Sequence, residues 1–258
     1  MEWTLIYILV ATLAGGLLSV TIAAALTVSL LGRLVKGLVS LSAGVLLGTA
    51  LLNVLPEAFE SSVGPQRLFL TLLGGLLFFW LLEKAELYRH AHHHEGDGHH
   101  HHDEFDAEQA GRGGYSVLLG DSIHNFCDGI IIAAAFLADH RLGMVTALAI
   151  VAHEIPQEVG NFAVLLHAGF SRGKALVWNI LSGLTAVLGG VVGWFALRDA
   201  MTLLPYALAV AAASLLYVAV ADLIPGLHRR TDPRASAAQI FWIGAGIALV
   251  AFAESLVH

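Results

Sequence analysis

The sequence predicts an all-α polytopic membrane protein with eight transmembrane helices, and three observations lead to this prediction. Of its 258 residues, 57% are hydrophobic and 13% are charged, whereas a soluble domain carries about 25% charged residues. Apolar stretches that reach the bilayer-spanning length of about 20 residues follow one another almost end to end. Basic residues gather in alternate loops. No soluble domain of ordinary size fits between the spans, so we interpret residues 1–258 as a single membrane domain.

The expected helices are separated by glycine, proline or charged residues. The first begins beside Glu2 without a basic segment, and its apolar run is too long for a signal peptide, so we expect it to be retained. A compact chain without a presequence fits a multi-pass protein of the plasma (inner) membrane of a prokaryote, and a eukaryotic organelle is the alternative. The single cysteine excludes an internal disulfide. The eight expected spans are residues 3–31, 38–59, 67–88, 115–138, 143–169, 174–197, 203–224 and 238–257.

The basic residues are distributed unevenly between the two sides of the expected bundle. Because basic loops stay in the cytoplasm, this distribution predicts both termini outside and the loop of residues 89–114 inside. The outer side would hold three basic residues: Arg67, Arg141 and Arg198. The inner side would hold the other ten: Arg33, Lys36, Lys84, Arg89, Arg112, Arg172, Lys174, Arg229, Arg230 and Arg234.

The one long expected loop, residues 89–114, is rich in histidine and acidic residues. Such a composition cannot form a packed core, and histidine tracts of this kind bind metal ions. Two interpretations are open, a solvated linker and a metal buffer or sensor; a purification tag is not expected between two spans. The candidate metal-binding residues in the loop are His92, His93, His94, His99, His100, His101 and His102.

The polar residues in the middle of two neighbouring spans, 115–138 and 143–169, indicate the chemistry. Residues four apart share one face of a helix, and three pairs have this spacing: His124 with Asp128, His153 with Gln157, and Glu154 with Glu158. At a rise of about 1.5 Å per residue, both histidines lie roughly 15 Å deep in a hydrocarbon core of about 30 Å. An antiparallel helix pair would bring both sets together near the midplane.

The motifs of these two spans combine three carboxylates, Asp128, Glu154 and Glu158, and two histidines, His124 and His153, with no lysine or arginine close by. A polar contact that joins two helices is the plain alternative, but carboxylates at this depth need a cation. We therefore predict a metal site. Imidazole with carboxylate suits Zn²⁺ and tolerates Fe²⁺, Mn²⁺ and Cd²⁺. Pro156 removes a backbone hydrogen bond beside these residues, as in the interrupted helices at transporter binding sites.

A second pattern links the expected second and seventh spans. Asn53 stands three residues before Pro56, and Asp222 stands three residues before Pro225, on opposite sides of the membrane. This is the pattern of an inverted repeat of helices 1–3 and 6–8 around helices 4–5. If the repeat holds, Asn53 and Glu57 belong to an outer mouth and Asp222 to an inner one. Punctuation of helix ends is the alternative.

With these residues, the chain resembles the ZIP family of metal transporters over nearly its whole length. The fourth span has the pattern His-Asn-Phe-x-Asp-Gly and the fifth His-Glu-x-Pro-x-Glu-x-Gly, similar to the LIV-type branch. The residues 79–84, before the His-rich loop, and the Leu-Pro-Glu of the second span also resemble that branch. These motifs are highly specific in combination.

The resemblance implies uptake of Zn²⁺ or a similar ion toward the cytoplasm, a two-metal centre between helices 4 and 5, and an often homodimeric assembly. It also implies an elevator movement of helices 1, 4, 5 and 6 against helices 2, 3, 7 and 8. Glu158 matches the second carboxylate of the LIV-type motif. The positions that match the family metal site are His124, Asn125, Asp128, His153, Glu154 and Gln157.

The chain departs from the LIV-type motif at two positions. The LIV-type motif has His where this chain has Gln157 and Asp where it has Asn161. An amide is a weaker ligand than an imidazole for borderline metals, so harder ions such as Mn²⁺ and Fe²⁺ gain ground. We place Asn161 on the metal pathway. Ala186 lies in a region where some bacterial relatives have an acidic ligand, which weakens the prediction of a full second metal site.

Two other classes of protein share some of these sequence features. A metalloprotease of the His-Glu-x-x-His type needs its second zinc ligand at position 157, which is Gln157; we therefore expect no enzyme. A membrane metal sensor or an exporter that works through the His-rich loop remains the alternative to metal uptake. The expected partners are the divalent ion, the bilayer and a second copy of the chain, with no organic cofactor and no nucleic acid.

Overall fold

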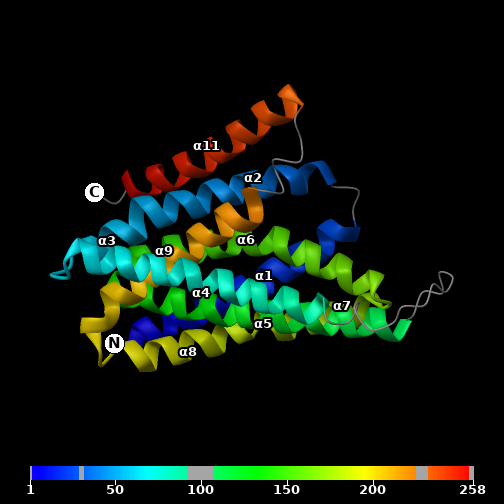
Figure 1. The fold of residues 1–258 in the computed structure, drawn as a ribbon, viewed down its shortest axis with the longest axis horizontal. Helices are drawn as coiled ribbons and strands as arrows, with labels where there is room; N and C mark the ends of the chain where they lie inside the picture. The colour runs from blue at the N-terminus through cyan, green and yellow to red at the C-terminus, as the bar shows by residue number, and fades with distance from the viewer. Residues whose placement is uncertain (1, 29–31, 92–106, 225–231, 256–258) are drawn as a thin grey trace.

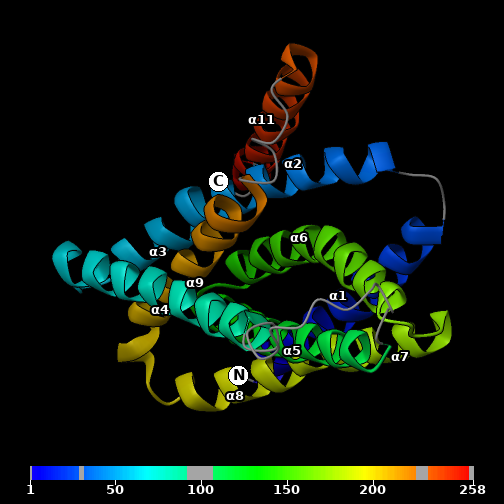
Figure 2. The same cartoon turned by 45° about the vertical axis from the view of Figure 1, so that its right-hand side comes forward.

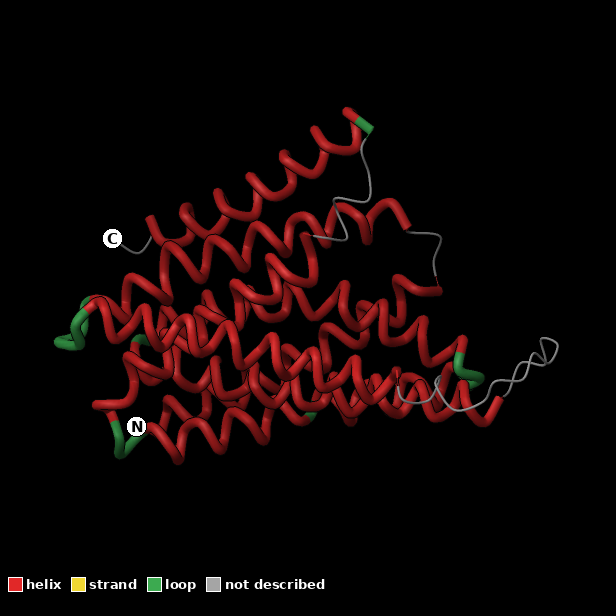
Figure 3. Tube along the Cα trace, viewed as in Figure 1, coloured by secondary structure: helices red, strands yellow, loops and turns green. Residues whose placement is uncertain are grey.

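The computed structural model describes residues 2–28, 32–91, 107–224 and 232–255. Within these ranges the secondary structure is entirely helical (Figures 1 and 3), which confirms the predicted all-α class. The His-rich tract of residues 92–106 lies outside the described residues, and so do the predicted ligands His92–His94 and His99–His102. The side chain of Asp222 is likewise outside the description.

The helices fall where the sequence predicted them, and several are divided into shorter elements. The expected loop of residues 89–114 is too long at both ends, because the neighbouring helices continue into it. Ala, Glu and Gln have a high helix propensity, so a segment rich in them can form a helix without being apolar. The elements are α1 (Glu2–Val28), α2 (Gly32–Gly48), the π-helix η1 (Thr49–Val54), α3 (Leu55–Phe59), α4 (Pro65–Ala91), α5 (Ala107–Ala138), α6 (His140–His167), α7 (Arg172–Gly183), α8 (Thr185–Leu197), the 3-10 helix η2 (Met201–Leu203), α9 (Leu204–Tyr217), the π-helix η3 (Val218–Leu223) and α11 (Pro233–Ser255).

Seven of the helical segments in the described residues are long and apolar enough to cross a membrane. They are Trp3–Leu26, Gly37–Phe59, Pro65–Lys84, Val117–Ala138, Arg172–Leu197, Met201–Ala221 and Pro233–Ala253. The expected fifth span is not among them. It corresponds to α6, which has 28 residues and packs against α1, α2 and α5. Its buried polar residues, among them His153 and Glu158, lower its hydropathy, so the count of eight stays a prediction.

The helices form two groups that meet along α2, α6, α5 and α9. In the first group α1, α5, α6, α7 and α8 pack on one another. In the second, α2 packs against α11 and α4 packs against α9. In Figure 2, α11 and α2 lie above α6, and α1, α5, α7 and α8 lie below it. The helices that carry the predicted metal ligands, α5 and α6, both belong to the first group.

The packing partners are those that the predicted inverted repeat requires. The repeat exchanges α1 with α8, α2 with α9, α4 with α11 and α5 with α6. Under this exchange the contact of α1 with α6 becomes that of α8 with α5, and the contact of α4 with α9 becomes that of α11 with α2; all four are among the most extensive in the fold. The two π-helices obey the same exchange, because η1 packs on α9 and η3 packs on α2.

The π-helices occupy equivalent positions in the two halves. Each has six residues, and each begins seven positions before a proline, η1 before Pro56 and η3 before Pro225. Proline lacks the N–H that would bond the carbonyl one turn earlier. A widened turn is a common local adjustment of a helix, often at functional sites. The equal spacing strengthens the inverted repeat beyond the short sequence match on which it was predicted.

Figure 1 identifies two ends of the bundle that the following sections use. At the terminal end, on the left, α1 begins, α11 ends and α5 turns into α6. At the loop end, on the right, α4 ends at Ala91 and α5 begins at Ala107. Both termini therefore lie at the same end, as an even number of crossings requires.

Close backbone contact holds α5 against α8. A Cβ atom on Gly129 would overlap the carbonyl oxygen of Ala186, and one on Gly189 would overlap the carbonyl oxygen of Phe126. Small residues permit such approach, and in lipid, where no hydrophobic force draws helices together, close packing is a main source of helix association. Contact with α8 thus fixes the position of α5, the helix that carries His124 and Asp128.

We predict that Gly129→Ala lowers the free energy of unfolding by about 1–3 kcal/mol or more, because the added methyl group forces α5 and α8 apart. Gly74→Ala is the control, since a Cβ there has no neighbour within 4 Å and alanine improves helix propensity by about 0.5–1 kcal/mol. Thermal unfolding in detergent, followed by tryptophan fluorescence, measures both. Equal melting temperatures for the two variants would contradict the packing described.

Candidate metal centre

The predicted ligands are brought together by the tight turn between α5 and α6. Asp139 ends the turn as the N-cap of α6, where its Oδ1 accepts from the backbone nitrogens of Arg141 (2.8 Å) and Leu142 (3.1 Å). His124 lies 14 residues before the end of α5, and His153 lies 13 residues after the start of α6. Both are therefore about 20 Å from the turn, at the same depth of an antiparallel pair.

Four side chains from these helices form a compact cluster, which we name the four-ligand group: His124, Asp128, His153 and Glu154. The two Nε2 atoms of the histidines are 3.2 Å apart. Asp128 Oδ2 lies 3.6 Å from His124 Nε2 and 3.3 Å from His153 Nε2. Glu154 Oε1 lies 3.5 Å from His124 Nε2 and 3.4 Å from His153 Nε2.

These distances can be compared with a tetrahedral zinc site. Zinc lies about 2.0–2.2 Å from nitrogen and carboxylate oxygen ligands, so neighbouring ligand atoms of a tetrahedron are separated by about 3.3–3.6 Å. Five of the six separations in the four-ligand group are given above and span 3.2–3.6 Å. The group therefore has the dimensions of a tetrahedral Zn²⁺ site.

Burial explains why these atoms need a cation. The side chains of Asp128, His153 and Glu154 are 3%, 1% and 4% exposed, while His124 is 21% exposed. Within the described residues, Asp128 Oδ2 and both carboxylate oxygens of Glu154 are buried without a hydrogen bond of good geometry. Buried acceptors without a partner are costly. The more exposed His124 marks the side from which an ion reaches the group.

The ring orientation of His153 suits metal binding. Its Nδ1 is 3.4 Å from the carbonyl oxygen of Ala149, one turn back on α6. With the proton on Nδ1, the lone pair of Nε2 points at the other three ligand atoms. Backbone carbonyl groups commonly fix the tautomer of metal-binding histidines in this way.

A second cluster, named here the carboxylate group, adjoins the first and consists of Asp121, Glu154 and Glu158; one oxygen from each lies within 4.8 Å of the others. Glu154 belongs to both. Glu158 is fully buried, and neither of its oxygens has a hydrogen-bond partner among the described residues. An all-oxygen set suits a harder cation than the four-ligand group does.

Asp121 was missed by the sequence analysis. It lies outside the matched motif, but it stands three residues before His124 and seven before Asp128, and this spacing places all three on one face of α5. Its burial (4% exposed) could not be inferred without the neighbouring helices.

The other predicted residues of the centre lie around Asp121. Gln157 and Asn161 both donate side-chain N–H groups to its carboxylate. Asn125 is buried, and its Nδ2 donates to the backbone oxygen of Asp121 at 3.1 Å. The structure therefore brings all seven predicted metal-site residues into one region, but four of them, with Glu154 rather than Gln157, form the tetrahedral cluster.

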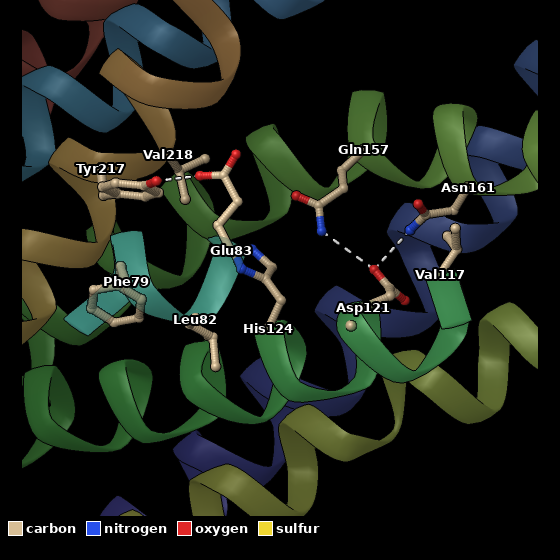
Figure 4. A pocket seen from close by; sticks show the side chains of 11 residues that line it. Phe79, Leu82, Glu83, Val117, Asp121, His124, Gln157, Asn161, Tyr217 and Val218 are labelled. Carbon is tan, nitrogen blue, oxygen red and sulfur yellow. Dashed lines mark hydrogen bonds between the residues drawn. The ribbon is translucent and has the colours of Figure 1, made fainter. Parts of the chain in front are cut away.

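A cavity of about 240 Å³ adjoins this region (Figure 4), and Glu83, Val117 and Asn161 in its wall lie nearer the loop end than the terminal end of their helices. His124, Asp121 and Gln157 form one part of its wall. Glu83 of α4 lies across the cavity and accepts a hydrogen bond from the hydroxyl of Tyr217. The cavity therefore extends from the centre toward the end where α4 finishes and α5 begins.

A second cavity, of about 290 Å³, lies at the terminal end. Its wall includes Asn53 and Glu57, which were predicted to belong to one mouth, together with Glu60, Asp139 and Arg141. Along α6, the buried residues Thr146, Ala147, Ala149 and Ile150 come between this cavity and His153. The centre thus adjoins the first cavity and is separated along α6 from the cavity at the terminal end.

Pro156 has the effect on α6 that its chemistry predicts. Without an N–H group it cannot donate to the carbonyl oxygen of Ala152. The Oγ of Ser42, on α2, lies 2.5 Å from this oxygen and donates to it, sharing its proton with Leu38 O at 2.7 Å. The freed carbonyl beside the metal ligands is therefore satisfied by the other helix group.

Helices of membrane-spanning length around a buried set of metal ligands define the class: a polytopic membrane protein with a transition-metal site inside its bundle. The ZIP Zinc transporter family model matches residues 83–254. The chain is 33% identical over 240 residues to "Zinc transporter ZIP13" of Pongo abelii, which covers 83% of this chain and 65% of that protein. The human protein of the same name is 32% identical over 263 residues, or 83% of this chain and 69% of that protein.

The chain belongs to the ZIP family. "Zinc transporter ZIP4" of Homo sapiens is 43% identical over 120 residues, which is 46% of this chain and 18% of that protein. The chain therefore spans less than two thirds of the length of human ZIP4 and of Pongo abelii ZIP13. "Zinc transporter ZIP10" of Homo sapiens is 42% identical over 111 residues, which is 43% of this chain and 13% of that protein.

We predict that His153→Ala weakens Zn²⁺ binding by more than about 100-fold, since even loss of a residue that only supports a ligand costs 10- to 100-fold. His167→Ala is the control, because His167 is an exposed histidine of the same helix. Isothermal titration of the purified protein in detergent measures both affinities. Unchanged binding in His153→Ala would refute the four-ligand group as a metal site.

We predict that Ser42→Ala lowers the free energy of unfolding by about 1–3 kcal/mol, because the carbonyl of Ala152 loses its partner. Ser255→Ala is the matched control: its hydroxyl donates to Phe252 O on an exposed turn, and we expect a change within about 0.5 kcal/mol. Thermal unfolding in detergent compares the two. A neutral Ser42→Ala would show that the hydroxyl does not stabilise the break at Pro156.

Proposed function

We propose that this chain transports a divalent transition metal, Zn²⁺ in the first place, through the four-ligand group and toward the cytoplasm. The observation that carries the proposal is the tetrahedral arrangement of two imidazole nitrogens and two buried carboxylate oxygens without a cationic side chain. A resident structural metal would fit the same ligands, so transport needs a further argument.

The two cavities supply that argument. One reaches the centre from the loop end, and the other approaches from the terminal end but stops short of it. A site open to one side at a time is what alternating access requires. The basic residues favour the loop end as the cytoplasmic side, so the conformation described is open inward. In the proposed membrane, the plasma (inner) membrane, both termini would face outward.

In the proposed transport step the ion enters past Glu57 and Asn53 and exchanges water for the side chains of the centre. Asp128, His153 and Glu158 are buried there, and His124 stands at the opening. The ion then leaves past Asp222 toward the His-rich loop, where it can be buffered. The group of α1, α5, α6, α7 and α8 moves as a unit against the other helices, which requires the contacts of α2 with α6 and of α9 with α5 to slide.

The ligand chemistry favours Zn²⁺, because two imidazoles and two carboxylates are a typical zinc set. The relatives whose names specify a metal are zinc transporters. The carboxylate group and the amides of Gln157 and Asn161 extend the proposed range to Fe²⁺, Mn²⁺ and Cd²⁺. We propose no enzymatic activity, since Gln157 replaces the second zinc ligand of a protease motif, and we propose a homodimer as the assembly.

We predict that Asp128→Asn and Glu158→Gln each reduce saturable Zn²⁺ uptake into proteoliposomes to the level of empty liposomes, because each removes one buried negative charge that replaces the hydration of the ion. Asp199→Asn is the matched control: it removes an exposed carboxylate that pairs with Arg198, and uptake should be unchanged. An entrapped zinc-sensitive dye reports the flux for both membrane orientations.

The elution profile and melting temperature of each variant show whether it is folded. Normal uptake in folded Asp128→Asn and Glu158→Gln proteins would refute the proposed route. Tight Zn²⁺ binding without flux in the parent protein would instead favour a membrane metal sensor.

A further inference from the structure

The two positions at which this chain departs from the LIV-type motif of the fifth span meet at one atom. Gln157 Nε2 donates to Oδ1 of Asp121 at 3.3 Å, and Asn161 Nδ2 donates to the same oxygen at 2.7 Å. Gln157 and Asn161 are one turn apart on α6, and Asp121 belongs to α5. The two replaced residues are therefore not independent changes; they share a partner on the facing helix.

Asp121 is itself held in place. Its other oxygen, Oδ2, accepts from the hydroxyl of Ser182 on α7 at 2.5 Å, and the residue is 4% exposed. One carboxylate thus joins three helices of the same group. Because its Oδ1 accepts from both amides, Asp121 orients them with their nitrogen atoms toward it.

This orientation decides which atom Gln157 presents to the cavity. With the nitrogen bound to Asp121, the carbonyl oxygen points the other way. Figure 4 shows the side-chain oxygen of Gln157 turned toward the part of the cavity where Glu83 and His124 lie. A free glutamine could turn either its NH₂ group or its oxygen toward a cation, and the NH₂ group would repel it.

We propose that Asp121 is a positioning residue that holds the amide of Gln157 with its oxygen toward the transported ion, and so helps to set the metal preference. This inference rests on the proposed metal-transport function. The site then offers a fixed neutral oxygen where the LIV-type motif offers an imidazole. Oxygen ligands favour harder ions such as Mn²⁺ relative to Zn²⁺, so the range of accepted ions widens.

Asn161 fits this arrangement because it is neutral. Its Nδ2 donates the shorter of the two bonds to Oδ1 of Asp121. An aspartate at this position, as in the LIV-type motif, would place a second carboxylate against Asp121, and like charges at that distance disfavour each other. Asn161 therefore donates a second hydrogen bond to the oxygen that orients Gln157.

A double-mutant cycle tests the proposal on metal binding, without any transport measurement. The variants are Asp121→Ala, Gln157→Ala and the double variant, each titrated with ZnCl₂ and, separately, with MnCl₂ in a calorimeter. We expect Asp121→Ala and Gln157→Ala each to weaken Mn²⁺ binding about tenfold, the lower limit for loss of a group that orients a ligand. Zn²⁺ binding should fall less, because two imidazoles hold it. The double variant should bind Mn²⁺ no more weakly than either single variant.

Two further variants separate positioning from folding and from direct ligation. Ser182→Ala removes the bond to Oδ2 and keeps the bond to Gln157, so it should leave the ratio of the two affinities unchanged. Asp121→Asn keeps an acceptor oxygen for Gln157 and should retain most of the Mn²⁺ affinity that Asp121→Ala loses.

Several results would overturn the inference. If the losses from Asp121→Ala and Gln157→Ala multiply in the double variant, Asp121 acts independently, as a ligand in the carboxylate group. If Asp121→Asn binds Mn²⁺ as weakly as Asp121→Ala does, the charge of Asp121 matters and the orientation of Gln157 does not. If Asp121→Ala leaves the ratio of the Mn²⁺ and Zn²⁺ affinities unchanged, Asp121 does not set the metal preference. Failure of the parent protein to bind either metal would refute the proposed function and not this inference alone.

Discussion

Burial of carboxylate groups without a neighbouring cationic side chain is the constraint on which the rest of this structure depends. The chain has no lysine or arginine from His124 to Asp139 or from Leu142 to His167, yet Asp128, Glu154 and Glu158 are at most 3% exposed. In a bilayer such an arrangement is stable only if a cation or protons neutralise it. The tetrahedral spacing of the ligand atoms explains how one metal ion could satisfy the acceptors that the protein leaves without a partner.

The architecture around the centre answers a second requirement, that the ligands stay fixed relative to one another while access changes. α5 is locked against α8 by backbone contact at Gly129 and Gly189, and one carboxylate, Asp121, links α5, α6 and α7. At the interface with the other helix group, α6 packs on α2 and α5 packs on α9. There the polar link described is one serine hydroxyl on the carbonyl that Pro156 frees. Rigid contacts inside each group and adaptable contacts between them are what movement of one group past the other would need.

The π-helices η1 and η3 belong to the inverted repeat and also border the two cavities. Both halves of the repeat carry a widened turn at the same distance before a proline, and in the first half this turn brings Asn53 to the cavity at the terminal end. The π-helix of the first half thus borders the cavity at the terminal end, and the π-helix of the second half borders the other cavity through Val218. At Gln157 and Asn161 the chain has neutral amides where the LIV-type motif has His and Asp. Both amides donate hydrogen bonds to Asp121.

The sequence by itself determined the class, the helices and the kinds of ligand, because hydropathy, helical periodicity and ligand type are local properties. It also indicated His124, Asp128, His153 and Glu154, each of which has a polar partner four residues away on its own helix. It did not identify Asp121, whose role depends on partners from α6 and α7, and it did not tell Glu154 from Gln157 as the fourth member of the tetrahedron. It set the loop at residues 89–114, although both flanking helices continue into it. Only the tertiary structure decided these matters, since the direction of each side chain across an interface follows from the rotation and register of the packed helices, which no single helix specifies.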